Sequence, residues 1–200
     1  MEEKLIIEIY RKKDPEELTK LLSEPESKPD LGSAAALVAA DACAMGLRAA
    51  KLTEKSLSGH ERLDYILRNL EKLRAYMVYL IDEDVKCRSL LSKAEKKGDA
   101  REIDAARRPA SCICEEIINQ MCNTLDLLTE LADMDRQGSM YIVASVHMCM
   151  AAIQSAMAFV LDMSSQSSDD TYVFVTRREN EITLEKYSAV AEAVLAKLNK

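Results

Sequence analysis

The chain has 200 residues, which is enough to form one hydrophobic core without disulfides or metal ions. With only 5 Gly and 4 Pro and many residues that tolerate helix, it is expected to form a single all-α domain over residues 1–200. The formal net charge of -7 argues against nucleic acid as the main partner, because phosphate binding depends on dense Lys and Arg.

The first 13 residues carry charges on both sides of a short apolar run, unlike a secretory signal peptide. We therefore expect a cytoplasmic protein whose six cysteines are reduced thiols. Cys112 and Cys114 would point to nearly opposite faces of one helix, so the cysteines are interpreted as small buried hydrophobic residues and no metal site is expected.

Two helices are predicted in the first quarter of the chain. Asp14 as N-cap and Pro15 at the first helical position predict a short helix that ends near Leu22. After a proline-containing loop, Gly32-Ser33 predicts the start of a helix to about Leu52, with Ser33 as its cap.

The segment His60–Lys97 has the clearest helical periodicity, which predicts one long amphipathic helix. Gly98 is suited to the left-handed turn that ends such a helix. Its apolar positions follow steps of three and four residues: Leu63, Ile66, Leu67, Leu70, Leu73, Met77, Leu80, Ile81, Cys87 and Leu91.

Two further helices are expected, from near Pro109 to Asp133 and after Gly138. The segment Gly138–Leu161 has no charged residue and is long enough to span a bilayer. Polar residues interrupt it and no basic cluster marks both ends, so a buried central helix is favoured over a membrane span.

The last part of the chain is predicted to contain a polar loop, Ser164–Asp170, and a helix from near Thr183 to Leu198. Thr171–Val175 has strand-like composition, although a lone strand would have nothing to pair with. The expected architecture is an up-and-down helical bundle of about five or six helices.

Asp84 interrupts an apolar seven-residue series on the long helix, at positions 63, 70, 77, 84 and 91. A carboxylate that faces a helical core has a raised pKa and is a plausible general acid or base. The alternative is that the helix turns outward and Asp84 is solvated. Asp82 lies about 200° away around the helix, so the two do not form one site on geometry alone.

Two other pairs of polar residues share a helix face. Asp41 and Arg48 lie on one stripe, either lining a pocket or as ordinary surface charges. His147 and Gln154 lie seven residues apart beside alanines, either as ligand-binding groups or as hydrogen-bonded core residues.

Several common active sites have no counterpart in the sequence. It has no phosphate-binding glycine loop and no G-x-S-x-G motif. A di-iron bundle requires Glu-x-x-His motifs, and neither His60 nor His147 has Glu three residues before it.

The order of several segments resembles the cyclodeaminase/cyclohydrolase family of folate enzymes. The likeness begins with a proline loop ending in Gly-Ser before an Ala/Leu helix with Leu-Thr, and it covers about residues 15–165. The segments are Pro29–Leu37, Ala49–Thr53, Leu80–Asp84, Pro109 with the Leu-rich helix that follows, and Gly138-Ser139.

The resemblance implies an all-α homodimer that binds a tetrahydrofolate derivative as substrate, without a tightly bound cofactor. It implies closure of 5-formiminotetrahydrofolate with loss of ammonia, or hydrolysis of the methenyl bridge. Asp84 and Asp82 are the candidate catalytic residues. The candidate ligand-binding residues are Gly32, Ser33, His147 and Gln154, with Arg48, Lys51 and Lys55 for the glutamate tail.

The chain departs from the family pattern at Asp30-Leu31, where the family has successive glycines, and at Met140, where it has an aspartate. Two hypotheses follow. The chain is a folate enzyme, or it is a catalytically inactive helical binding or scaffold protein that kept the fold.

Overall fold

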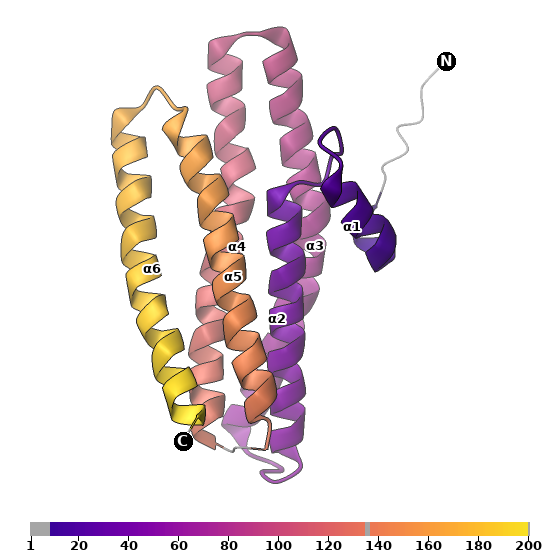
Figure 1. Cartoon of the computed structure of the whole chain (residues 1–200), viewed down its shortest axis with the longest axis vertical. Helices are drawn as coiled ribbons and strands as arrows, with labels where there is room; N and C mark the ends of the chain where they lie inside the picture. The colour runs from indigo at the N-terminus through magenta and orange to yellow at the C-terminus, as the bar shows by residue number, and fades with distance from the viewer. Residues whose placement is uncertain (1–8, 135–136, 200) are drawn as a thin grey trace.

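The computed structural model describes residues 9–134 and 137–199, and the regular elements within these ranges are all helices (Figure 1). This confirms the predicted all-α bundle. The elements are η1 (Tyr10–Lys12), α1 (Pro15–Ser23), α2 (Leu31–Glu54), α3 (Glu61–Lys97), α4 (Ala100–Met134), α5 (Ser139–Ser165) and α6 (Asp170–Leu198).

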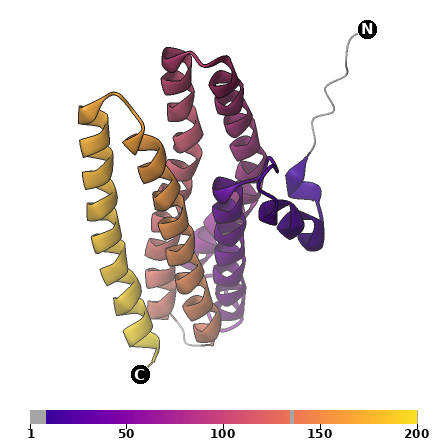
Figure 2. The same cartoon turned by 45° about the horizontal axis from the view of Figure 1, so that its top comes forward.

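The long helices run alternately up and down, as predicted (Figure 1). Helix α2 packs against α3 and α5, α4 packs against α3 and α5, and α6 covers α5 and α4 from outside. Helix α1 lies beside α3 on the opposite side of the bundle from α6, and the turned view of Figure 2 keeps this order. The main core therefore lies among α2, α3, α4 and α5.

Small side chains allow α2 and α5 to pack closely. A Cβ atom at Gly46 would lie 3.0 Å from Leu128 Cδ2 and 3.2 Å from Ser145 Oγ. The Ser145 hydroxyl donates a hydrogen bond to the Ala42 carbonyl oxygen at 2.7 Å, which satisfies it inside the core. The backbones of these two helices are thus held together by both packing and a buried polar contact.

Helices α2 and α5 are both long and apolar enough to cross a membrane. In the bundle, 61% of the most apolar window of α2 and 50% of that of α5 are buried. Packing inside the bundle accounts for much of this apolar character, as expected for core helices. That the chain does not associate with a membrane stays a prediction.

The sequence signals for several helix ends are confirmed. The Asp14 carboxylate accepts a hydrogen bond from the Glu17 N–H at 2.8 Å, and Pro15 is the first residue of α1. Helix α3 covers almost the whole predicted segment and ends at Gly98, which has a φ of 77°. These signals are local, so they can be read without knowledge of the packing.

Three expected helix starts were wrong: those of α2 and α4, and that of α6. Helix α2 begins at Leu31 with Asp30 at the N-cap, so Ser33 lies inside the helix and does not cap it. Helix α4 begins at Ala100, and Pro109 lies within it. The Asp99 carboxylate starts α4 early, because it accepts hydrogen bonds from two N–H groups of the first turn.

The last helix was expected from near Thr183, but α6 begins at Asp170, so the strand-like segment Thr171–Val175 is helical. The Asp169 carboxylate accepts a hydrogen bond from the Tyr172 N–H at 3.0 Å and so caps the helix. The Tyr172 ring then packs under the Arg108 guanidinium, 5.1 Å from the ring centroid. Capping and packing against α4 override the β propensity of this segment.

Gly138→Ala is expected to destabilise the fold, because a Cβ at this position would lie 2.8 Å from Ala49 Cα and 3.0 Å from Ala49 O. Backbone atoms cannot move aside, so we expect a loss of about 1–3 kcal/mol in the free energy of unfolding, measured in urea. Gly46→Ala is the comparison, because its Cβ would meet side-chain atoms only and the substitution gains about 1 kcal/mol of helix propensity, so a smaller loss is expected. Equal losses in the two variants would contradict this explanation.

Candidate functional site at the start of helix α2

Asp84 is fully buried, with 0% of its surface exposed. Its place on the apolar seam of α3 is therefore as predicted, and the alternative of a solvated Asp84 is wrong. A buried carboxyl group needs hydrogen-bond donors to compensate for the water it loses. The neighbouring helix α2 supplies them.

The Asp84 carboxylate accepts a hydrogen bond from the hydroxyl group of Ser33, the third residue of α2, at 2.7 Å from Ser33 Oγ to Asp84 Oδ2. The Ser33 backbone N–H also favours the charged carboxylate and so lowers the pKa of Asp84. Asp84 therefore lies at the first turn of α2, at the end where the helix dipole favours negative charge.

Gly32 makes room for this contact. A Cβ atom at Gly32 would lie 2.7 Å from Asp84 Cγ, so no side chain can be placed there without moving the carboxylate. The other oxygen, Asp84 Oδ1, is buried and has no hydrogen-bond partner among the described residues. One oxygen thus accepts the Ser33 hydroxyl group, while the other lies closest to the position that a Gly32 Cβ would take and makes no hydrogen bond with a described residue.

Asp30 sits at the N-cap of α2 but makes no capping hydrogen bond. Its carboxylate instead forms an ion pair with Arg88, 2.7 Å from Arg88 Nη2 to Asp30 Oδ2. The guanidinium carbon of Arg88 lies 5.1 Å from the ring centroid of Phe159 on α5. Arg88 thus connects α3 with the start of α2 and with α5.

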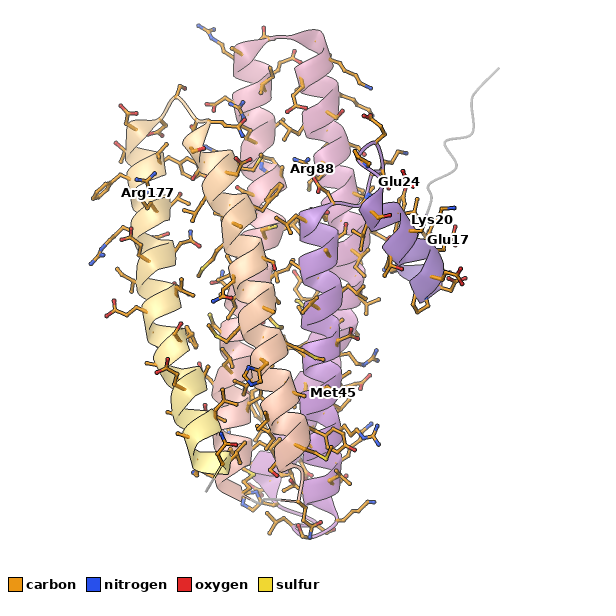
Figure 3. The ribbon with its side chains drawn as sticks, in the orientation of Figure 1. Glu17, Lys20, Glu24, Met45, Arg88 and Arg177 are labelled. Atoms are coloured by element: carbon orange, nitrogen blue, oxygen red, sulfur yellow. The ribbon has the colours of Figure 1, made fainter. Side chains whose placement is uncertain are left out.

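Arg88 and Phe159 were not predicted as site residues from the sequence. A signal for Arg88 was present, because it lies four residues after Asp84 and so on the same side of α3. Figure 3 shows Arg88 near the beginning of α2, between α5 and α3. No local pattern marked Phe159, since its place beside Arg88 depends on how α5 packs.

Burial raises the pKa of Asp84 above its ordinary value of 3.8. The hydrogen bonds from Ser33 oppose this rise, as does the positive charge of Arg88, while the negative charge of Asp30 adds slightly to it. Desolvation is the largest of these effects. The site therefore favours a protonated Asp84 more than water does, which suits a general acid.

Asp82 belongs to a different contact. Its carboxylate accepts a hydrogen bond from the Arg11 backbone N–H at 3.1 Å and lies 3.2 Å from Arg11 Nε. Arg11 also lies over the ring of Tyr79. As the helical geometry predicted, Asp82 and Asp84 do not share one site, and Asp82 holds the segment that contains η1 against α3.

The predicted tail-binding cations lie far along α2 from Asp84. At about 1.5 Å per residue, Arg48 is about 22 Å and Lys51 about 27 Å from Ser33 along the helix axis. All three cations, including Lys55, are exposed. They border a hollow of about 380 Å³ between α2 and α3.

The other predicted polar residues also lie outside the Asp84 site. His147 and Gln154 are both exposed on α5, so they are not buried core residues. Asp41 is exposed on α2 and does not line the hollow, whereas Arg48 does. Of the predicted site residues, the structure thus brings Gly32, Ser33 and Asp84 into contact, and it places Arg48, Lys51 and Lys55 around the separate hollow.

The described residues contain no cluster of three His, Cys, Asp or Glu side chains that could hold a metal ion. Four cysteines are buried, as expected, but Cys87 is half-buried and Cys112 is exposed. Cys112 is exposed because it lies two residues from the buried Cys114 and so on the outer face of α4. All six thiols are free.

Comparison with known proteins agrees with this architecture. The family model described as Formiminotransferase-cyclodeaminase matches residues 15–181. The fold is similar to that in the crystal structure of formiminotetrahydrofolate cyclodeaminase from Thermotoga maritima, with a TM-score of 0.79 and 22% sequence identity over 94% of each chain. A comparison with curated protein sequences found no match.

The helical bundle and the matched family model together define the class of protein. The match spans most of the chain, including the start of α2 and the Asp84 segment of α3. The chain belongs to the formiminotransferase-cyclodeaminase family. The structural likeness, at this level of identity, shows the fold, and the activity is a separate question.

Asp84→Asn is expected to change how stability depends on pH. Because the folded-state pKa of Asp84 is raised, the folded protein holds its proton above pH 4, where an unfolded chain would release it. The free energy of unfolding of the wild type should therefore fall as pH rises from 4 to the raised pKa, relative to Asp84→Asn. The slope is at most about 1.4 kcal/mol per pH unit.

Urea unfolding of both proteins between pH 4 and pH 8 measures this difference. The matched control is Asp162→Asn, which changes an exposed aspartate on α5 that accepts a hydrogen bond from Gln166. If the free energies of unfolding of the wild type and Asp84→Asn changed with pH in the same way, burial would not raise the pKa of Asp84.

Proposed function

We propose that this protein is a folate enzyme that acts on the one-carbon group at N5 and N10 of tetrahydrofolate. The reaction is that of a formiminotetrahydrofolate cyclodeaminase or a methenyltetrahydrofolate cyclohydrolase. The observation that supports this proposal is the buried Asp84 carboxyl group, of which one oxygen accepts a hydrogen bond from Ser33 and the other has no hydrogen-bond partner among the described residues. Family membership makes folate the substrate to test first.

In the cyclodeaminase reaction, N10 attacks the formimino carbon on N5 and a new carbon–nitrogen bond forms. N10 loses its proton, and the formimino nitrogen gains protons and leaves as ammonia. The net reaction converts 5-formiminotetrahydrofolate and one proton into the 5,10-methenyl cation and ammonia. A protonated Asp84 would deliver a proton to the departing nitrogen, and its carboxylate would recover one from N10.

In the cyclohydrolase reaction, water adds to the bridging carbon of the methenyl cation and releases a proton. The bond from this carbon to N5 then breaks, N5 takes up the proton of the added hydroxyl group, and 10-formyltetrahydrofolate forms. Both steps require a group that accepts and returns protons near N5. The same carboxyl group can serve either reaction, so the geometry of the site does not distinguish the cyclodeaminase from the cyclohydrolase reaction.

Ser33 and Arg88 act as positioning residues in this proposal. Ser33 fixes one oxygen of Asp84 by a hydrogen bond, and the other oxygen lies against Gly32 without a hydrogen-bond partner among the described residues. The Asp30–Arg88 pair is partly exposed, with 48% and 29% of the two side chains accessible, and its charges act on the pKa of the buried Asp84.

The cations of α2 do not fit the same bound folate. A ligand that contacts both Asp84 and Lys51 would have to extend about 27 Å along α2. We therefore assign the pterin end to the start of α2 and treat the cationic hollow as a separate site. Asp82 would support catalysis only indirectly, by holding Arg11 and its segment on α3.

The alternative is a non-catalytic helical binding or scaffold protein of the same family. Two features favour it. Asp84 has no exposed surface, and Met140 stands where the family has an aspartate and is itself 69% exposed. Activity measurements separate the two proposals.

Asp84→Asn should strongly lower the rate of folate turnover. The decay of 5,10-methenyltetrahydrofolate, followed by its near-ultraviolet absorbance, and ammonia release from 5-formiminotetrahydrofolate measure the two reactions. Loss of a general acid or base lowers the rate by about 10²–10⁴-fold. We expect a loss of this size in kcat, with a smaller change in KM.

Asp162→Asn is the activity control, because Asp162 is an exposed aspartate on α5 outside the proposed site. Turnover that is equal in Asp84→Asn and the wild type would reject Asp84 as the catalytic group. If the folded wild type turns over neither substrate but binds a folate in calorimetry, the binding-protein alternative holds.

We also propose that the protein is a cytoplasmic homodimer that pairs through the outer face of α5. This face has no Asp, Glu, Lys or Arg from Ser139 to Leu161, and it exposes Met140, His147, Ala151, Gln154 and Ala158. An uncharged surface of small residues can contact its own copy around a two-fold axis without burying charge.

Ala151→Glu should convert the dimer to a monomer, because the dimer would bury two unpaired carboxylates. Light scattering after size-exclusion chromatography measures the mass. The control is Ala189→Glu, an equally small exposed position on α6. A monomeric wild type, or a dimer that persists in Ala151→Glu, would rule out this interface.

A further inference from the structure

Arg88 has two carboxyl groups nearby, and in the structure it pairs with Asp30. It lies four residues after Asp84, the spacing at which an aspartate and an arginine on one helix form an ion pair. Its Nη2 atom instead lies 2.7 Å from Asp30 Oδ2, at the start of α2. From this arrangement we infer that Asp30 is a positioning residue for the proposed reaction, because it keeps the Arg88 guanidinium group from pairing with Asp84.

The carboxylate of Asp30 is free to take this role. Asp30 is the N-cap of α2, where an aspartate usually accepts a hydrogen bond from the first turn of the helix. Its side chain makes no such hydrogen bond. The first turn of α2 instead contacts Asp84, through the Ser33 hydroxyl group at 2.7 Å. The contact with Arg88 therefore does not compete with a capping contact of Asp30.

A second contact holds Arg88 in the same position (Figure 3). Its guanidinium carbon lies 5.1 Å from the ring centroid of Phe159, a cation–π distance. Asp30 and Phe159 belong to α2 and α5, so two helices other than α3 hold the guanidinium group. Asp84 Oδ1 has no hydrogen-bond partner among the described residues, so Arg88 does not bind it.

The partner of Arg88 matters because Arg88 and Asp30 supply charge next to Asp84. The positive charge of Arg88 lowers the pKa of Asp84, and the negative charge of Asp30 raises it. Helix α5 adds no charge here, since it has no Asp, Glu, Lys or Arg from Ser139 to Leu161. A guanidinium group that moved from Asp30 to Asp84 would therefore meet no other charge of α5 that could hold it back.

The other titratable groups around Asp84 do not replace this control. The thiols of Cys87 on α3 and Cys114 on α4 lie near Asp84, but burial raises the pKa of both above 9.0, so both are neutral at pH 7. Arg11, in η1, is paired with Asp82 at 3.2 Å. The position of the Arg88 charge is thus the main variable that Asp30 controls.

An ion pair with Arg88 would make Asp84 a poorer proton donor. A carboxyl group beside a guanidinium group loses its proton at lower pH, and the attraction is stronger away from water. The proposed reaction requires Asp84 to hold a proton and deliver it to a nitrogen of the substrate. This use of Asp30 rests on the proposed function, whereas its effect on the Asp84 proton does not.

The test measures the titration of Asp84 directly, in the full chain without folate. Carbon-13 NMR follows the side-chain carboxyl carbons of labelled aspartate, and Asp84→Asn assigns the Asp84 signal. Asp30→Asn releases Arg88, so the titration midpoint of Asp84 should move to lower pH by at least about one unit. Asp30→Glu should keep the wild-type midpoint, because it keeps the ion pair. Urea unfolding checks that each variant is folded.

Two further variants separate the charge of Arg88 from a general change in structure. In Asp30→Asn/Arg88→Gln the guanidinium group is gone, so the midpoint of Asp84 should not fall below that of the wild type. The matched control is Glu130→Gln, which breaks an exposed ion pair between α4 and Arg62 on α3 and should leave Asp84 unchanged. An unchanged midpoint in Asp30→Asn, or an equal fall in the double variant or the control, overturns the inference.

Turnover measurements keep this inference apart from the folate proposal. In an active enzyme, the fall of kcat at high pH should begin at lower pH in Asp30→Asn, in step with the NMR midpoint. A loss of kcat that is equal at every pH would assign Asp30 a structural role only and would overturn the inference. If the wild type turns over no folate but the midpoint moves as expected, the folate proposal fails and the control of Arg88 by Asp30 stands.

Discussion

The contact between the Asp84 carboxyl group and the first turn of α2 is the constraint on which the candidate site depends. A buried carboxyl group loses its hydration, and here the Ser33 hydroxyl group and the positive end of the α2 dipole partly replace it. The arrangement requires Gly32, because a side chain there would occupy the space of the carboxylate. It also frees Asp30 from capping, and Asp30 instead pairs with Arg88. A substitution at any of these positions would therefore disturb the others.

The same contact fixes the positions of three helices relative to one another. Asp84 joins α3 to the start of α2, and Arg88, one turn further along α3, reaches Phe159 on α5. On the other side of α3, Arg11 ties the N-terminal segment to Asp82. These polar contacts thus fix how far the helices are shifted along their axes relative to one another, in a bundle whose packed faces are otherwise aliphatic. Alanine-rich faces alone would specify register weakly, because similar small residues recur at each turn.

The fold and one member of the site were predictable from the sequence, because the signals were local or periodic. The seven-residue series placed Asp84 on the apolar face of α3, and Asp14, Pro15 and Gly98 marked helix ends. The errors came from contacts between distant segments. Ser33 looked like an N-cap, but the partner of its hydroxyl group lies 51 residues away on α3. The sequence also could not show how far Arg48, His147 and Gln154 lie from Asp84, since this depends on which faces of α2 and α5 are buried.

The two ends of α2 carry opposite charge, and the helix dipole explains only part of this pattern. Carboxyl groups lie at its start, and Lys51 and Lys55 lie at its end, where cations interact favourably with the dipole. This effect fades within the last turn, so it accounts for neither Arg48, nearly two turns from the end, nor Arg74, which belongs to α3. Stability of α2 would be served by the two lysines alone. The other two cations have partners of their own, because Arg74 forms an ion pair with Glu71 and Arg48 lies over the ring of Tyr141 on α5. Contacts between helices thus account for the positions of these two arginines.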